Sequence, residues 1–91
     1  MAKYKLIRAK SFIKEYKKLS SQLQDEVDKI LTKLENGEKL ESKYKDHALK
    51  GNLSGLRDCH IKHDLVLFYK LNEYELILTA LRINSHSELG I

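Results

Sequence analysis

Leu65-Val66-Leu67-Phe68-Tyr69 is an uninterrupted apolar run, with Asp64 before it and Lys70 after it. A short apolar run between charged residues is typical of a central strand that is covered on both faces. This stretch is therefore predicted to be the centre of a β-sheet, and the segments around it must supply the neighbouring strands and the layer that packs on them.

The segments on either side of this run supply its predicted partners. After it, the turn at residues 72–74 leads to an apolar stretch, residues 75–83, which must run antiparallel to the central strand because so short a connection permits nothing else. Before it, residues 56–62 alternate in character, and the turn pair Ser54-Gly55 separates them from a strand-like segment at residues 47–53. The second half of the chain is therefore predicted to form four strands.

The first half of the chain is predicted to form one strand and two amphipathic helices. Residues 4–8 are β-prone, so they form a strand that must find its partners later in the chain. A first helix is expected to begin near Ser11. A second begins at Ser21, which with Gln24 has the spacing of a capping box, and Asn36-Gly37 supplies the left-handed exit that closes it.

The resulting element order is β-α-α-β-β-β-β. Two consecutive amphipathic helices present a joint apolar stripe that a sheet must cover. We therefore predict an α+β fold, a twisted, mainly antiparallel sheet packed on one face by an α-helical hairpin. With 91 residues, of which 42% are hydrophobic and 33% charged, the chain is expected to form a single globular domain over residues 1–91.

Composition also restricts the compartment and the partners. No segment has the apolar length of a signal core or a membrane span, so a cytoplasmic protein without membrane contact is expected. One cysteine, Cys59, excludes an internal disulfide, and within an alternating strand it is interpreted as a small buried hydrophobe rather than a nucleophile. The net charge of +4 suits a phosphate backbone or an acidic protein partner.

Three of the four histidines lie between residues 46 and 64, and the fourth, His86, follows Arg82 near the C-terminus. Histidine titrates closest to neutral pH, so these side chains could move protons beside an anionic substrate. A zinc site built from the histidines and Cys59 is the alternative. Cys59 and His60 should point to opposite faces of a strand, and no C-x-x-C or H-E-x-x-H spacing is present, so no metal or other cofactor is expected.

An ordered set of motifs carries a resemblance to a known family. KDHALKG at residues 45–51 is followed by LRDCHIK at residues 56–62, and LR-x-x-SHSEL covers residues 81–89. This order resembles the RelE/YafQ type of bacterial toxin, the ribosome-dependent mRNA endonucleases of type II toxin-antitoxin systems. The resemblance covers nearly the whole chain. It implies a RelE-like fold, metal-independent cleavage of mRNA on the ribosome, and neutralisation by a cognate antitoxin.

The resemblance also implies a set of catalytic residues. Cleavage through the RNA's own 2′-hydroxyl requires a base, an acid for the leaving 5′-oxygen, and a cation for the charge that grows on the phosphorus centre. The positions that match the family's acid/base residues and its phosphate-stabilising arginine are His47, His60, Asp64, Arg82 and His86. His86 is expected to be the acid and His60 or His47 the base, and Asp64 is expected to orient a histidine or to raise its pKa through its negative charge. Which histidine performs which role stays open at this point.

The basic residues of the same stretch are candidate phosphate contacts, with an ordinary solvated charge as the alternative for each. They are Lys45, Lys50, Arg57 and Lys62. Two departures from the family pattern bear on activity: Leu65 and Ile91 stand where the relatives carry aromatic residues that could stack on bases. A non-catalytic relative that still binds an antitoxin or nucleic acid is therefore the alternative function.

Overall fold

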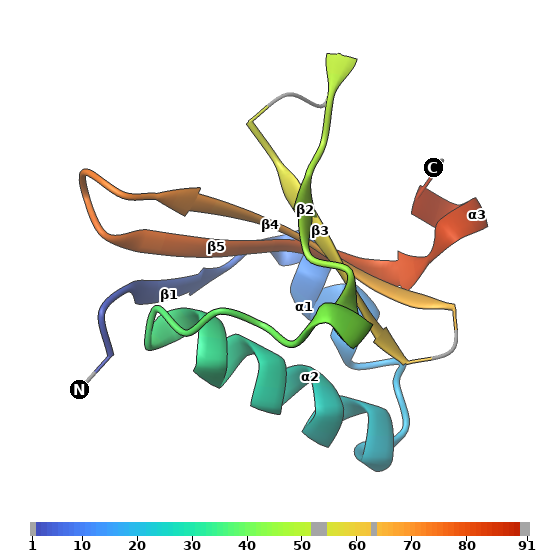
Figure 1. Ribbon diagram of the computed structural model, residues 1–91. Coiled ribbons are helices and arrows are strands. Elements are labelled where there is room, and N and C mark those ends of the chain that lie inside the picture. Colours follow the sequence, from blue (N-terminus) through green and yellow to red (C-terminus); the bar gives the residue numbers. More distant parts are fainter. Residues whose placement is uncertain (1, 52–54, 63, 90–91) are drawn as a thin grey trace.

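The computed structural model describes residues 2–51, 55–62 and 64–89, and for His86 the backbone only. Five strands form one sheet in the order β1-β5-β4-β3-β2, in which β1 is parallel to β5 and the other neighbours are antiparallel. The α+β prediction and the central place of the Leu65 run are confirmed (Figure 1). In chain order the elements are β1 (Lys5–Arg8), α1 (Lys10–Tyr16), α2 (Ser21–Glu35), the 3-10 turn η1 (Ser42–Tyr44), β2 (His47–Ala48), β3 (Arg57–Lys62), β4 (Leu65–Asn72), β5 (Ile77–Ser85) and α3 (His86–Leu89).

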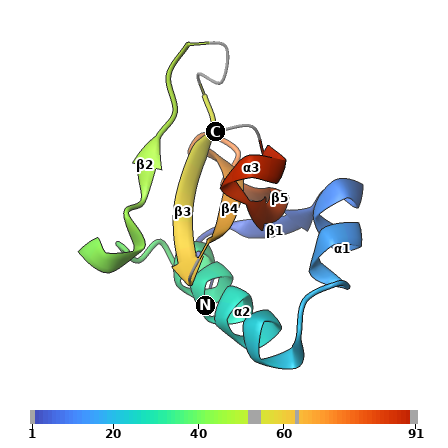
Figure 2. The same cartoon turned by 90° about the vertical axis from the view of Figure 1, so that its right-hand side faces the viewer.

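The main core lies between one face of the sheet and the helices α1 and α2. The two helices diverge: α1 packs against β5, whereas α2 lies against β3 (Figure 2). Apolar residues of α2 recur every three or four positions, which places them along the side that faces the sheet. The largest buried side chains of this core are Phe12, Ile30, Leu31, Leu67, Tyr69, Leu78 and Ile83.

Two predicted boundaries are wrong for identifiable reasons. The N-cap of α2 is Ser20 rather than Ser21, because the Ser20 hydroxyl accepts a hydrogen bond from the Leu23 amide at 3.3 Å, and Gln24 donates instead to the Tyr16 carbonyl at 2.9 Å. The last strand begins at Ile77 rather than at residue 75. The Asn72 side chain accepts the amides of the next turn, which delays the return of the chain to the sheet.

The strand predicted at residues 47–53 is reduced to His47–Ala48 in β2. Leu49 still donates its amide to the Leu56 carbonyl, but residues 49–51 are not part of the strand. Residues 52–54, and with them Ser54 of the predicted turn pair, lie outside the described residues. Gly37 has a φ of +76°, so the predicted left-handed exit of α2 is confirmed.

Helix α1 takes the place of a strand along the second half of β5. β1 pairs with β5 only as far as Ala80, and a register irregularity then leaves Leu81 without a rung partner on β4. Beyond that point, Ser11 donates its hydroxyl to the Leu81 carbonyl at 2.7 Å, and the Glu15 carboxylate accepts the Ile83 amide at 3.2 Å. The side chains of α1 therefore satisfy backbone groups that a longer β1 would otherwise pair.

Among the described residues, none of the helices is both long enough and apolar enough to cross a membrane.

Candidate active site

The predicted site residues lie on the face of the sheet opposite the main core. On β3, Cys59 is completely buried in that core, so Asp58 and His60 must project from the other face. Directly paired residues on antiparallel strands share a face, and the pairing gives two rows across the sheet. One row is His47, Asp58, Phe68 and Arg82, and the next is His60, Val66 and Asn84.

The first row brings a histidine and an arginine to the same surface. Neighbouring strands are about 4.8 Å apart, so three spacings separate the backbones of His47 and Arg82 by about 14 Å. Phe68 of β4 lies between them in the row, and the Arg82 side chain reaches Glu15 of α1.

Two oxygen atoms lie close to the same ring nitrogen of His47. Its Nδ1 lies 2.7 Å from the Lys45 carbonyl oxygen and 3.1 Å from Oδ1 of Asp58. A carbonyl oxygen and a carboxylate oxygen can only accept, so Nδ1 carries a proton, and Nε2 of the neutral ring is left as an acceptor. The His47 side chain is 52% exposed, whereas that of Asp58 is 3% exposed. The His47 ring therefore has Nδ1 next to a buried carboxylate, and Nε2 is the ring nitrogen farther from that carboxylate.

Asp58 is a site residue that the sequence analysis did not assign. The motif LRDCHIK includes it, but an acidic residue in an alternating strand is normally a solvated one. Its role depends on the pairing of β2 with β3, which sets it directly opposite His47. The signal in the sequence was its place two residues before His60, on the same face of β3.

Arg82 is already bound to a carboxylate of α1. Its Nε and Nη2 donate to Glu15 at 3.1 and 2.7 Å, and Asn84 donates to the same carboxylate at 2.8 Å. Partial burial of Glu15 favours its neutral form, but the hydrogen bonds from Arg82, Asn84 and the Ile83 amide outweigh it, so the pKa of Glu15 falls below its ordinary value. The paired guanidinium stays charged and fixed, with its side chain 41% exposed.

The remaining predicted catalytic positions, His60, Asp64 and the backbone of His86, lie toward one end of the sheet. Leu65 at the start of β4 pairs with Ser85 at the end of β5, so Asp64 and the backbone of His86 are next to this rung. His60 is one rung away, opposite Val66. The Ser85 hydroxyl caps the following turn by accepting the Glu88 amide at 3.3 Å. The His86 side chain, His63 and Ile91 lie outside the described residues.

Comparison with known proteins identifies the family of this chain. The family model for the bacterial toxin of type II toxin-antitoxin systems, YafQ, matches residues 4–90. The chain belongs to the YafQ toxin family. The resemblance to RelE/YafQ-type toxins is thereby confirmed.

Individual relatives show the same likeness. The chain is 41% identical over 46 residues to the mRNA interferase toxin YafQ of Escherichia coli, which covers 50% of this chain and 48% of the relative. It spans about half the length of the curated relatives that it matches. Among solved structures, the E. coli DinJ-YafQ toxin-antitoxin complex has a TM-score of 0.82 at 28% identity, covering 96% of this chain and 97% of that one. A metal-bound toxin from Helicobacter pylori has a TM-score of 0.81 at 36% identity, covering 94% and 98%.

The candidate RNA-binding residues of this YafQ-family chain are not all on the histidine face. Lys45 and Lys50 are exposed on either side of β2. Lys62 lines a shallow groove with Leu23 and Glu26 of α2, which places it on the helix side of β3. Arg57 is on the core face, paired with Tyr69. Of these four residues, Lys45 and Lys50 therefore lie exposed beside β2, which carries His47, whereas Arg57 is next to β2 but is held on the core face.

Two other features are separate from the histidine face. Burial raises the pKa of the Cys59 thiol well above its ordinary value, so this cysteine stays protonated and takes no part as a nucleophile. Within residues 2–51, 55–62 and 64–89, no group of three or more histidine, cysteine or acidic side chains is arranged to hold a metal ion.

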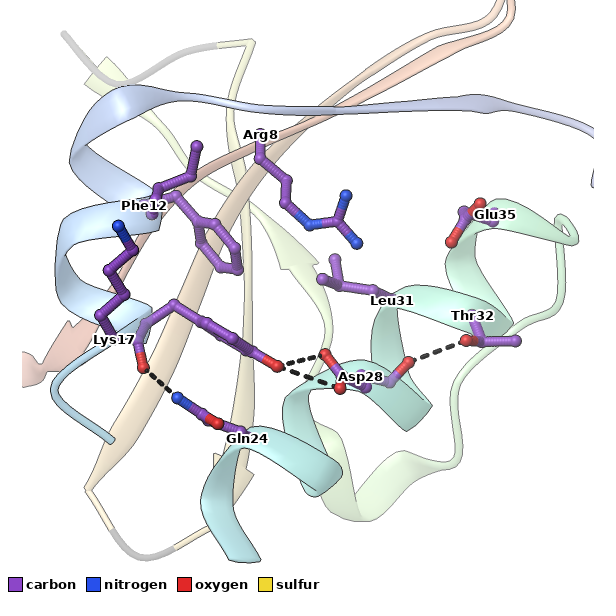
Figure 3. Close-up of a pocket in the computed structure, with 10 residues that line it drawn as sticks. Arg8, Phe12, Lys17, Gln24, Asp28, Leu31, Thr32 and Glu35 are labelled. Atoms are coloured by element: carbon purple, nitrogen blue, oxygen red, sulfur yellow. Dashed lines mark hydrogen bonds between the residues drawn. The ribbon is translucent and has the colours of Figure 1, made fainter. Parts of the chain in front are cut away.

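A groove of about 570 Å³ opens between α1, α2 and the end of β1 (Figure 3). Two cations, Arg8 and Lys17, and two carboxylates, Asp28 and Glu35, line it, and the Tyr16 hydroxyl donates to Asp28 at 2.9 Å. Its charges balance and it is on the helix side of the sheet, so it is not part of the histidine site.

Proposed function

We propose that this YafQ-family chain is the endoribonuclease toxin of a type II toxin-antitoxin system. It cleaves mRNA on the ribosome without a metal ion and is neutralised by a cognate antitoxin. The relative from E. coli is named an mRNA interferase toxin, and a structure of that toxin with its antitoxin DinJ has the same fold. The observation that carries the proposal is the row of His47, Asp58 and Arg82 across one face of the sheet.

The proposed reaction is a transfer within the RNA strand. The 2′-hydroxyl loses its proton to a histidine while its oxygen attacks the adjacent phosphorus. The bond from phosphorus to the 5′-oxygen breaks, and that oxygen takes a proton from a second histidine. His47 is suited to the first step because its Nε2 is the acceptor of an exposed, oriented ring. His86 is the proposed acid, and His60 is the alternative base.

Arg82 supplies the positive charge for the transition state. Negative charge grows on the phosphoryl oxygens as the new bond forms, and a cation that is already fixed in place stabilises it without reorganisation. Glu15 holds the guanidinium from the α1 side through Nε and Nη2. Asp64, at the turn before β4, is proposed to orient His60 or His86.

The test is cleavage of mRNA by purified protein in the presence of translating ribosomes. His47, His60 and His86 are each replaced by alanine in turn. The variant that lacks the acid and the variant that lacks the base should each cleave ~10²–10⁴-fold more slowly. His63→Ala is the matched control, a histidine of the same stretch with no proposed role, and it should cleave at the wild-type rate. Growth arrest by His86→Ala at the wild-type expression level would contradict its assignment as the acid.

The chemical groups at the ends of the RNA products, together with the effect of a chelator, test metal independence. Transfer through the 2′-hydroxyl leaves 2′,3′-cyclic or 3′-phosphate ends and 5′-hydroxyl ends, and a chelator should not change the rate. The metal-bound state of the H. pylori relative makes this experiment necessary. Products with 5′-phosphate ends that disappear on chelation would replace the proposed mechanism with a metal-dependent one.

The alternative, a non-catalytic relative, is separated by expression with and without the neighbouring antitoxin gene. A toxin should arrest growth when expressed alone and lose this effect when the antitoxin is present. A chain that binds the antitoxin but never arrests growth or cleaves mRNA would be the non-catalytic relative.

A further inference from the structure

Next to His47 in the sequence, a cluster of three polar side chains joins Asp46 to the sheet; its tyrosine is buried, and its carboxylate and guanidinium are partly exposed. Tyr69, from the central strand β4, donates its hydroxyl to Oδ1 of Asp46, and Arg57 of β3 donates from Nε to the same tyrosine oxygen at 3.2 Å. Nη2 of Arg57 lies 3.4 Å from Oδ2 of Asp46. Tyr69 is completely buried in the main core. We call Asp46, Arg57 and Tyr69 the Asp46 clamp.

The consecutive residues Asp46 and His47 have their partners on opposite faces of the sheet. Asp46 is fastened on the core face, where Arg57 and Tyr69 form a rung of β3 and β4. His47, the next residue, lies on the other face, with its Nδ1 3.1 Å from Oδ1 of Asp58. Adjacent residues of an extended chain point to opposite sides, so this short segment is held from both sides at once.

β2 needs such a clamp because its own pairing is minimal. It contains two residues, at the edge of the sheet, and pairs with β3 only through His47 with Asp58 and Ala48 with Arg57. The residue that precedes Asp46, Lys45, has a φ of +48°, a conformation that a lysine adopts only when its surroundings impose it. The Lys45 carbonyl oxygen also accepts the hydrogen bond from Nδ1 of His47.

We infer that the Asp46 clamp is a positioning device for His47, in which Arg57 and Tyr69 act through Asp46 to set the place of the proposed base. The inference rests on the proposed function of this chain as an RNA-cleaving toxin. It gives Arg57 a positioning role. Direct contact of Arg57 with RNA stays a prediction. Burial and the hydrogen bond to Asp46 raise the pKa of Tyr69, so its hydroxyl remains a donor at neutral pH.

The variant that tests the clamp is Tyr69→Phe, which removes one hydroxyl and keeps the ring in the core. Tyr16→Phe is the matched control, because Tyr16 also donates to a carboxylate, that of Asp28, on the helix side of the molecule. Two readouts are used: the ring ¹⁵N signals of His47 by NMR, and the separate values of kcat and KM for cleavage on ribosomes.

In Tyr69→Phe, the His47 signals should move from those of a ring with protonated Nδ1 toward those of a free histidine. kcat should fall by up to about 10²-fold, the cost of a displaced catalytic group, with KM little changed. Tyr16→Phe should change neither readout. Arg57→Lys keeps a cation beside Asp46, so it should retain a higher kcat than Arg57→Ala. If Arg57 acted only by contacting RNA, its replacement would raise KM and leave kcat little changed.

The NMR readout does not depend on catalysis, so the two proposals fail separately. If wild-type protein cleaves no RNA but the His47 signals respond to Tyr69→Phe, the clamp is supported and the proposed function is overturned. If the folded Tyr69→Phe protein keeps both wild-type kcat and wild-type His47 signals, the clamp is overturned and the proposed function stands.

Discussion

Acceptor oxygens beside one nitrogen of a histidine ring favour the tautomer in which the other nitrogen is free to take a proton. For His47, the Lys45 carbonyl is the hydrogen-bond partner of Nδ1 at 2.7 Å, and Oδ1 of the buried Asp58 lies 3.1 Å from the same nitrogen. The arrangement keeps Nε2 deprotonated in the neutral ring and prevents the ring from turning over. At the scale of single residues, this orientation separates a candidate base from a solvated histidine.

Asp58→Asn tests the orientation directly. An amide is uncharged and can present either its oxygen or its NH2 group, so His47 would lose the negative charge beside Nδ1 while its hydrogen bond to the Lys45 carbonyl remains. We expect kcat for mRNA cleavage to fall by about 10–10²-fold, less than the ~10²–10⁴-fold expected for His47→Ala. Asp25→Asn, an exposed position on α2, is the control. Wild-type kcat in Asp58→Asn, with His47→Ala inactive, would show that the carboxylate is not needed.

Leu65 is a second residue whose environment decides its role. It is partly buried and packs against the main core, although its position in the family pattern is that of a base-stacking aromatic. Leu65→Trp should therefore overpack the core and lower the free energy of unfolding by ~1–3 kcal/mol in denaturant titrations. Cleavage per folded molecule should not change. A variant with unchanged stability and faster cleavage would place residue 65 against the RNA.

At the scale of elements, α1 is both a layer of the core and the edge partner of β5. Its Glu15 carboxylate accepts hydrogen bonds from Arg82, Asn84 and the Ile83 amide, 67 to 69 positions away in the chain. One carboxylate therefore links the helix to the strand and fixes the arginine of the candidate site. The same hydrogen bonds to Glu15 therefore stabilise this end of the sheet and fix the position of the Arg82 guanidinium.

The lowered pKa of Glu15 gives this link a pH dependence. A carboxyl whose pKa is lower in the folded state stabilises the fold above its ordinary value, 4.5, and loses that effect as the pH falls through the lower folded value. Glu15→Gln should reduce the free energy of unfolding by ~1–3 kcal/mol at pH 7. The difference from wild type should shrink as the pH falls below 4.5.

Denaturant titrations from pH 7 downward provide the measurement, with Glu38→Gln, an exposed carboxyl after α2, as the control. A difference between Glu15→Gln and wild type that stays constant over the whole pH range would mean that the charge of Glu15 is not involved.

At the scale of the whole molecule, the sheet separates two surfaces with different duties. One face carries the core and the helices, and the other carries the proposed catalytic row with Lys45 and Lys50 beside it. Lysines that neutralise phosphates release counterions, so they determine how steeply binding weakens with salt.

Lys50→Ala should therefore lower the slope of log affinity against log salt by about 0.7 for single-stranded RNA, and it should do so for every sequence alike. Lys29→Ala, on α2, should leave the slope unchanged, since Lys29 is exposed on the helix side and lies 3.7 Å from Glu26. Binding isotherms of a catalytically inactive variant at several salt concentrations measure this. Equal slopes for wild type and Lys50→Ala would remove Lys50 from the interface.

The sequence by itself determined most of the elements of this protein, although not the length of the strand that begins at His47. The apolar run at residues 65–69 became the central strand, and the left-handed exit at Gly37 closed the second helix. These features depend on residues a few positions apart, whose spacing sets which side of a strand or helix is apolar. The ordered motifs around the histidines likewise led to the family, because a motif is a local property of the chain.

Only the tertiary structure decided which of these residues work together. Asp58 becomes the partner of His47 through a rung between β2 and β3, and Arg57 turns inward to Asp46 and Tyr69. Glu15 meets Arg82 across 67 positions of sequence. No periodicity encodes such pairs, because a charged side chain looks the same in the sequence whether water or a buried partner satisfies it, and the choice is made when distant segments pack.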